Sequence, residues 1–329
     1  MICLGIESTA HTFGVGIVSD DGTILANERN VFVPPSGGIH PREAAEHHTN
    51  AAQSVIQQAL DAAQLKLQDI NLISFSQGPG LGPCLRVGAI LSRYLSLHLK
   101  IPLYGVNHCI AHVEIGRLLH PVKIGDLLTL YVSGGNTLVC AFDGGRYRVF
   151  GETLDIPIGN LLDVFAREVG LAHPGGPKIE NLAKGERTFI ELPYTVKGMD
   201  LSYSGLLTAS INKYKEGTRL EDLCFSLQEI AFSMLTEVTE RALAHTEKPC
   251  VLLTGGVAAN KRLEQMIRII TEEHHGTFYG VPLKLAGDNG AMIAWTGLLH
   301  ARNEKALTIN ESLVKPNWRI DEVTISWAE

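Results

Sequence analysis

The sequence has no excess of positive charge, no closely paired cysteines and no long hydrophobic run. Its 35 acidic residues outnumber 28 lysines and arginines, and the net charge of −7 at pH 7 excludes a basic surface over the whole molecule for nucleic acid. A local basic patch or a basic partner is compatible with that charge. No apolar stretch reaches the roughly 18 residues that a membrane-spanning helix needs, so we expect no membrane association.

The cysteines are few and scattered. None of the six forms a C-x-x-C pair, and five lie in apolar surroundings, which is typical of reduced and packed thiols. The chain begins as an apolar strand, Met1–Ile6, without a cationic leader, so we expect no secretory signal. Together these features predict a cytoplasmic protein.

The composition that remains is that of a globular protein, with 45% hydrophobic and 19% charged residues. A length of 329 residues suffices for two domains, each with its own core. Low-complexity tracts and Ser/Pro-rich linkers are absent from the sequence.

A three-strand pattern occurs twice. The first copy is an apolar strand, a small-residue turn after Glu7, a returning strand to Val18, an Asp-Asp-Gly turn and a third strand to Val33. The second copy starts about 125 residues later at Leu127 and repeats this order to Thr153. A repeat at this distance indicates a duplication of whole α/β domains rather than a short solenoid repeat.

The duplication predicts two domains, residues 1–125 and 126–289, with residues 290–329 packing back onto the first. Further strands are predicted at 72–76, 101–106 and 250–253. Helices are predicted at 44–63, 85–99, 111–119, 160–169, 177–184, 220–244, 260–273 and 291–301.

Two histidines, His108 and His112, follow the short apolar strand 101–106. A helix would put both imidazoles on one face, with Cβ atoms about 6 Å apart, which is close enough to share a metal ion. Without further ligands, two ordinary helix histidines are the favoured interpretation. Asp288 is the natural candidate for a distant ligand, although its place at a helix start favours a capping role on local sequence.

Three glycine-rich or hydroxyl-rich turns have the composition of nucleotide sites. Residues 7–9 and 133–135 occupy matching places in the repeat, and such turns leave backbone N–H groups to cradle phosphate oxygens. Residues 252–260 join a buried strand to a helix through two glycines, which brings backbone close to a base, ribose or phosphate. Each also fits a purely structural turn, as does Gln77–Pro83, to which we assign no chemistry.

Nine motifs occur together in the order of a known family. The chain resembles the universal tRNA threonylcarbamoyl transferase, called TsaD in bacteria and the catalytic subunit of the KEOPS complex in archaea and eukaryotes. Asn136 and the pair Ala10-His11 resemble the archaeal branch. The motifs are Glu7-Ser-Thr-Ala, Gly37-Gly-Ile-His-Pro-Arg-Glu43, Gln77-Gly-Pro-Gly-Leu, Asn107-His-x-x-x-His112, Tyr131-Val-Ser-Gly-Gly-Asn-Thr137, Gly175-Gly-Pro, Ser202-Tyr-Ser-Gly205, Gly255-Gly-Val-Ala-x-Asn260 and Gly287-Asp-Asn-Gly290.

The resemblance implies an actin/Hsp70/sugar-kinase (ASKHA) fold of two duplicated α/β lobes with a nucleotide cleft between them. It implies transfer of the threonylcarbamoyl group from threonylcarbamoyl-AMP to the exocyclic amine of the adenosine beside the tRNA anticodon. It also implies one divalent metal ion, with Fe(II) favoured over Zn(II), and a site that ATP or AMP can occupy. The implied partners are tRNA and KEOPS subunits, including a small kinase/ATPase and a small dimerising subunit.

Residue by residue, the resemblance implies metal ligation by His108, His112, Tyr131 and Asp288. As a hypothesis for the mechanism, the amine attacks the threonylcarbamoyl carbon, and the metal and the backbone N–H groups of Ser133 and Gly134 stabilise the developing negative charge. Asp163 and Glu180 would accept hydrogen bonds from ribose hydroxyls. The implied donor site comprises Tyr131, Val132, Ser133, Gly134, Gly135, Asp163, Gly176, Glu180 and Asn260.

One departure from the family concerns the first hairpin. Bacterial members read E-T-S-C-D there, and their acidic residue has been proposed to assist catalysis. This chain has His11 at that place, which makes His11 a candidate catalytic base with a near-neutral pKa. Tyr203 stands where the family commonly has Phe, which is a mild change.

Two other functions stay open. A metalloprotease of the H-E-x-x-H type would need a glutamate between the histidines, where this chain has Cys109-Ile-Ala111. A sugar-kinase-like phosphotransferase would need an aspartate base but no histidine pair. Few basic residues are grouped where they could contact tRNA, so we expect the affinity for tRNA to depend on partner subunits. These residues are Arg29, Arg42, His47 and His48.

Overall fold

Two units make up the chain in the computed structural model, which describes residues 1–34 and 38–328. Unit 1 comprises Met1–Pro121, Gly144–Tyr147 and Asp288–Glu329, and unit 2 comprises Val122–Asp143 and Arg148–Gly287. The sequence predicts domain boundaries after residues 125 and 289. Unit 1 differs from this prediction because it also includes Asp288 and the hairpin tip Gly144–Tyr147. Gly37, which opens one of the family motifs, lies outside the described residues.

The sheet of unit 1 has the strand order β3-β2-β1-β4-β5. The first three strands form an antiparallel meander, whereas β4 runs parallel to β1 and β5 parallel to β4. Strands β1 and β4 are buried along almost their whole length, because helices cover both faces of the sheet. The strands are β1 (Ile2–Glu7), β2 (Thr12–Ser19), β3 (Ile24–Val31), β4 (Leu72–Gly78) and β5 (Leu103–Asn107).

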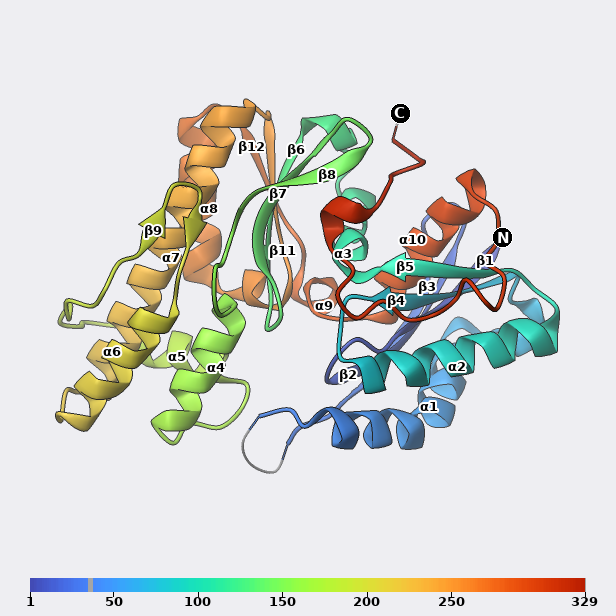
Figure 1. Ribbon diagram of the computed structural model, residues 1–329, viewed down its shortest axis with the longest axis horizontal. Coiled ribbons are helices and arrows are strands. Elements are labelled where there is room, and N and C mark those ends of the chain that lie inside the picture. The colour runs from blue at the N-terminus through green and yellow to red at the C-terminus, as the bar shows by residue number, and fades with distance from the viewer. Residues whose placement is uncertain (35–37, 329) are drawn as a thin grey trace. The chain divides into compact units, whose positions relative to one another are not determined.

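Helices cover both faces of this sheet. Helices α1 (Pro41–Ala63) and α2 (Gly82–Leu99) pack together on one face, and α3 (His108–Leu119) and α10 (Gly290–Asn303) on the other (Figure 1). Helix α10 approaches β1 and β2 very closely. A Cβ atom on Gly16 would lie 2.1 Å from the backbone nitrogen of Ala291, so only glycine fits there. This close packing holds the start of α10 against the sheet, and Asp288, two residues before the helix, also belongs to unit 1.

The C-terminal segment that follows α10 runs back along unit 1 and is fixed by hydrogen bonds to it. The backbone N–H of Leu307 donates to the carbonyl of Leu103 on β5 at 2.9 Å, and that of Lys315 donates to the carbonyl of Gln77 at 2.7 Å. The Gln77 amide in turn donates to the carbonyls of Glu311 and Leu313. These contacts connect the segment to residues of the first half of the chain.

Unit 2 repeats the topology of unit 1, with the strand order β12-β11-β6-β7-β8. An antiparallel partner, β7, again follows the first strand, β6, and a later strand, β11, again pairs with it in parallel. The predicted duplication is therefore confirmed. The strands are β6 (Leu127–Val132), β7 (Thr137–Asp143), β8 (Arg146–Glu152), β11 (Cys250–Thr254) and β12 (Thr277–Gly280).

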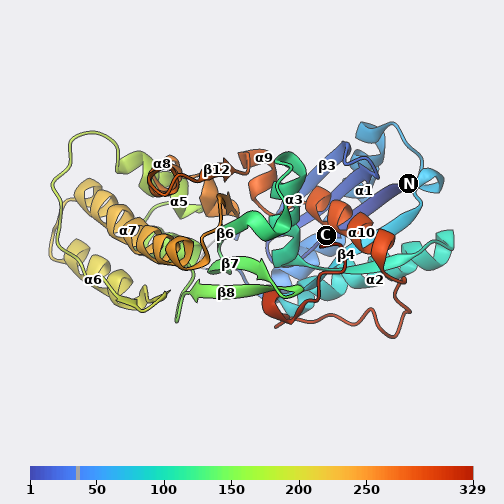
Figure 2. The same cartoon turned by 90° about the horizontal axis from the view of Figure 1, so that it is seen from above.

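The core of unit 2 centres on α7, whose buried face contacts the sheet, α5, α6 and α8. Figure 2 shows α6 lying along α7. The sequence predicted neither α6 nor β12. The helices are α4 (Ile158–Glu168), α5 (Gly175–Leu182), α6 (Ser204–Lys215), α7 (Leu220–Thr246), α8 (Lys261–Glu273) and α9 (Leu283–Ala286), and a small hairpin joins β9 (Val196–Lys197) to β10 (Asp200–Leu201).

No helix in the described part of the chain is both long and apolar enough to cross a membrane. The six cysteines are unpaired, and all except the partly exposed Cys250 are buried. The burial of five of them agrees with the expectation of packed thiols.

Candidate metal centre and donor site

Strand β5 leads directly into the histidine helix, and Asn107 forms the junction. Its side-chain oxygen accepts hydrogen bonds from the backbone N–H groups of Cys109 (3.0 Å) and Ile110 (3.2 Å), which is an N-cap. Its amide nitrogen donates to the carbonyl of Trp318 in the C-terminal segment at 3.1 Å. His108 is therefore held in the first turn of α3, as the sequence predicted.

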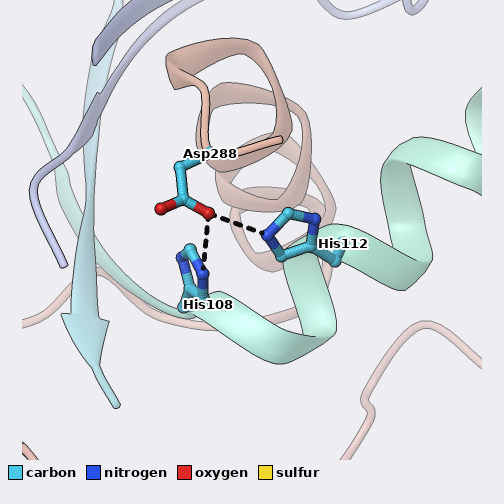
Figure 3. A group of neighbouring side chains, drawn as sticks. All are labelled: His108, His112 and Asp288. Atoms are coloured by element: carbon cyan, nitrogen blue, oxygen red, sulfur yellow. Dashed lines mark hydrogen bonds and ion pairs between the residues drawn. The ribbon is translucent and has the colours of Figure 1, made fainter. Parts of the chain in front are cut away.

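The two histidines share one buried face of α3. Their ring centroids lie 4.7 Å apart at an interplanar angle of 83°. Figure 3 shows both rings turned toward the carboxylate of Asp288: its Oδ1 lies 3.4 Å from Nε2 of His108 and 3.3 Å from Nε2 of His112. The three potential ligand atoms lie within 4.8 Å of one another, so this cluster fits a metal ion.

The capping role that local sequence favoured for Asp288 belongs to its neighbour. The side-chain oxygen of Asn289 accepts from the backbone N–H of Met292 at 3.0 Å and so caps α10. The Asp288 side chain instead points to the histidines, while its carbonyl lies 3.4 Å from a guanidinium nitrogen of Arg29. The alternative interpretation of Asp288 as a helix cap is therefore wrong.

Charge in this cluster is set by burial and by mutual contact. Burial would lower the pKa of His108, but the carboxylates of Glu7 and Asp288 raise it to about 10. Burial lowers the pKa of His112. Burial would raise the pKa of Asp288, but His108 and the hydrogen bonds from both histidines hold it well below its usual range. A divalent cation bound here would compete with the proton on His108.

Glu7 is a member of this cluster that we had not assigned to it. Its carboxylate is fully buried at the end of β1, and its Oε2 accepts a hydrogen bond from Nδ1 of His108 at 2.9 Å. Its other oxygen, Oε1, accepts from the backbone N–H of Thr9 at 2.6 Å and from the Thr9 hydroxyl at 2.5 Å. The available signal in the sequence was a charged residue ending an otherwise apolar strand.

The first hairpin differs from the phosphate cradle that we predicted at residues 7–9. The N–H of Thr9 is bonded to Glu7, and the N–H of Ser8 donates to the hydroxyl of Ser76 at 3.0 Å. These buried N–H groups are satisfied within the protein, and Glu7 of the same turn contacts His108. His11, the candidate base, is half-buried in the same turn and is one of the groups that lower the pKa of Asp288.

The predicted donor-site residues lie in unit 2, where hydrogen bonds and close backbone contacts connect the segments that carry them; we call this set of segments the ring. The N–H of Gly159, at the start of α4, donates to the carbonyl of Ser133 at 3.1 Å. Further along α4, Asp163 accepts from the N–H of Gly175, beside Gly176, at 2.7 Å. This ring begins at the carboxyl end of β6, where ligands bind in open α/β sheets.

The ring continues through α5 to α8. Glu180 of α5 accepts from the backbone N–H of Lys261 at 2.9 Å. Asn260, the N-cap of α8, follows the turn at Gly255, where a Cβ atom would lie 2.2 Å from the carbonyl of Val132. The sequence prediction thus named residues that lie together in unit 2.

Several of these side chains have structural contacts as well. The oxygen of Asn260 accepts from the N–H groups of Arg262 and Leu263, and its amide nitrogen donates to Gln228 at 3.0 Å. Gln228 is buried and was not predicted; it orients the Asn260 amide. One oxygen each of Asp163 and Glu180 is likewise engaged by backbone N–H groups, which leaves their second oxygens as the candidate acceptors for ribose hydroxyls.

The second hairpin turn is exposed at Gly134 and Gly135, as a site for a ligand requires. The Ser133 hydroxyl accepts from the N–H groups of Gly135 (3.3 Å) and Asn136 (3.0 Å), so these two donors are used within the turn. Tyr131 lies at the end of β6 in unit 2 and is fully buried. It therefore belongs to a different unit from His108, His112 and Asp288.

The duplicated sheet topology defines the class of protein, an actin/sugar-kinase-like α/β fold. HypF from T. kodakarensis is similar with a TM-score of 0.63 and 16% identity, covering 92% of this chain and 48% of that one. A ROK family glucokinase from Streptomyces griseus has a TM-score of 0.50 and 12% identity, covering 90% of this chain and 99% of that one. At these identities the likeness shows the fold alone, and it confirms the predicted class.

The chain belongs to the TsaD family, tRNA N6-adenosine threonylcarbamoyltransferase, whose family model matches residues 23–295. A protein of that name from Methanopyrus kandleri is 55% identical over all of this chain and 97% of the relative. A probable bifunctional tRNA threonylcarbamoyladenosine biosynthesis protein from Methanocaldococcus jannaschii is 56% identical, and the match spans 99% of this chain but 60% of that relative. The family predicted from the motifs is confirmed, and it favours a transferase over the protease and kinase alternatives.

Proposed function

We propose that this chain transfers the threonylcarbamoyl group from threonylcarbamoyl-AMP to the exocyclic amine of the adenosine next to the tRNA anticodon. Family membership supports the reaction. The single structural observation that supports a metal-assisted form of it is the convergence of His108, His112 and Asp288.

The chemistry is an acyl transfer. The adenosine amine attacks the carbonyl carbon of the threonylcarbamoyl group, the bond from that carbon to the phosphate oxygen breaks, AMP leaves, and the amine loses a proton. His11 is the proposed acceptor of this proton, since it lies in the same hairpin turn as Glu7, which contacts His108.

The donor is proposed to bind in unit 2, on the ring of residues that starts at the end of β6. Gly134 and Gly135 are exposed, so the adenylate can approach this turn, although the N–H groups of Gly135 and Asn136 are bonded to the Ser133 hydroxyl. The second oxygens of Asp163 and Glu180 are suited to ribose hydroxyls, and Asn260 borders the same place. ATP or AMP would use the same contacts.

The proposed metal ligands are His108, His112 and Asp288, together with Tyr131. Imidazole, carboxylate and phenolate groups suit Fe(II), which we favour, and also Zn(II). A divalent ion there would supply positive charge for the phosphate and carbonyl oxygens of the donor.

Removal of one ligand tests this proposal. We expect His108→Ala to lose bound metal and to reduce transfer to tRNA at least 100-fold in a reconstitution with threonylcarbamoyl-AMP, tRNA and partner subunits. His274→Ala, which changes a histidine at the end of α8, is the control and should keep both properties. Full metal content together with full activity in His108→Ala would refute the proposed site.

A further inference from the structure

Glu7 is the residue through which the structure extends the candidate metal site. It is the last residue of β1, where it pairs with Gly14 of β2, and its carboxylate is fully buried. A buried carboxylate is costly unless its oxygens accept hydrogen bonds. Contacts to Thr9 and His108 meet that requirement.

The two oxygens of Glu7 have separate partners. Oε1 is bonded to the backbone N–H and the hydroxyl of Thr9, at 2.6 and 2.5 Å, and these contacts fix the carboxylate plane. Oε2 is then directed to Nδ1 of His108 at 2.9 Å. Glu7 is therefore fixed by its own hairpin before it contacts the histidine.

This contact determines which nitrogen of His108 faces the cluster. A carboxylate accepts hydrogen bonds, so Nδ1 of His108 must carry the proton. The other nitrogen, Nε2, faces Asp288 Oδ1 at 3.4 Å. A histidine whose far nitrogen donates to a carboxylate is fixed in tautomer and ring orientation, and becomes a more basic metal ligand.

We propose that Glu7 is a positioning residue for metal binding: held by Thr9, it orients His108 and keeps the proton on Nδ1 so that Nε2 can bind the ion. This inference rests on the proposed metal site. It assigns to the first hairpin a function in metal affinity.

Glu7→Gln is the sharpest substitution because it keeps the size of the side chain. An amide has one oxygen, and the two Thr9 donors require it at the Oε1 position, so the NH₂ group would face His108 Nδ1. His108 would then have to accept at Nδ1 and carry its proton on Nε2, the nitrogen that the metal needs. Ser8→Ala is the matched control, since the Ser8 hydroxyl has no hydrogen-bond partner within the described residues.

The first measurement is the dissociation constant for Zn²⁺, by competition with a chromophoric chelator. We expect Glu7→Gln to weaken binding 10- to 100-fold and Ser8→Ala to change it less than twofold. Binding in Glu7→Gln within twofold of the unsubstituted protein would overturn the inference. His108→Ala separates the two proposals: if it binds Zn²⁺ as tightly as the unsubstituted protein, the metal site itself fails. If His108→Ala loses the ion while Glu7→Gln keeps it, only the function of Glu7 fails.

A second measurement needs no substitution. In the Zn²⁺-loaded protein with ¹⁵N-labelled histidine, NMR should show a hydrogen-bonded proton on Nδ1 of His108 and the metal at Nε2. A proton on Nε2 in that sample would overturn the inference, even if Glu7→Gln failed to fold.

Discussion

At the scale of single residues, His48 shows how burial changes what a side chain can do. The sequence suggested that His48 is one of a few basic residues available to tRNA. His48 is fully buried on α1, so this interpretation is wrong. Its Nε2 donates to the carbonyl of Ala10 at 3.0 Å, and its Nδ1 lies 3.3 Å from Nδ1 of His47. Burial, the main cause, and the neighbouring charge of His47 lower the pKa of His48 to about 4.

This shift predicts a pH dependence of stability. The folded protein resists protonation of His48 while the unfolded chain accepts a proton near pH 6.5, so its contribution is complete above about 6.5 and is lost as the pH falls toward 4. The loss should be roughly 2–3 kcal/mol.

The measurement is denaturant unfolding of the unsubstituted protein and of His48→Gln between pH 7.5 and 4. Glutamine keeps a donor for Ala10 but does not titrate in this range. The unsubstituted protein should lose more stability on acidification than the variant; parallel pH profiles would show that His48 is not responsible.

At the scale of elements, the close contact of α10 with β1 and β2 sets a strict requirement for glycine. A Cβ atom at Gly290 would lie 2.0 Å from the backbone nitrogen of Gly16, and both atoms belong to rigid elements. A Cβ atom at Gly205, on α6, would meet no atom within 4 Å in the described chain.

We therefore expect opposite effects from one chemical change. Gly290→Ala should destabilise the protein by about 1–3 kcal/mol or more through overpacking. Gly205→Ala should be neutral or stabilising by up to about 1 kcal/mol, because alanine favours the helix. The free energy of unfolding measures both, and equal effects would refute the packing argument.

The elements predicted from sequence were those with a strong local pattern. The meander repeat is visible because β1 and β6 are apolar runs that end in small-residue turns. Strand β12 is short and partly exposed, so its burial pattern carries little signal. The start of helix α6 is stabilised by the distant carboxylate of Asp155, which accepts hydrogen bonds from the N–H groups of Tyr203 and Ser204. Sequence spacing does not reveal this contact.

The same limit applies to the candidate site. The His108/His112 pair could be predicted because helical spacing places both rings on one face. The roles of Asp288 and Asn289 could not be separated, since either can cap a helix and only the fold turns Asp288 toward the histidines. The contacts of Glu7 and Gln228 depend on packing between segments far apart in the chain.

At the scale of the whole molecule, an exposed apolar stripe on α2 needs explanation. Ile90, Tyr94 and Leu97 follow helical spacing, and each is about 60% exposed. We expect this stripe to contact one of the partner subunits that the family resemblance implies. The negative net charge supports the view that tRNA affinity also depends on such partners.

We expect Ile90→Lys combined with Leu97→Lys to weaken assembly with partner subunits at least tenfold, because each lysine desolvates poorly in an apolar contact. Ile269→Lys, on the exposed side of α8, is the control. Assembly followed by size-exclusion chromatography, with tRNA binding of the same samples, gives the result. Undiminished assembly would contradict the expected contact at the stripe. Tight, salt-sensitive tRNA binding by the isolated chain would contradict the expected dependence of tRNA affinity on partner subunits.

The C-terminal segment has one more consequence for the whole molecule. Strand β5 is the last strand of its sheet, and an uncovered outer strand invites pairing with other chains. The hydrogen bond from the N–H of Leu307 to the carbonyl of Leu103 covers part of this sheet edge. The hydrogen bond from the Asn107 amide to the carbonyl of Trp318 connects the same segment to the start of α3. The same segment therefore protects the edge strand from pairing with other chains and holds the start of the histidine helix. A substitution that detaches it should increase aggregation and displace His108.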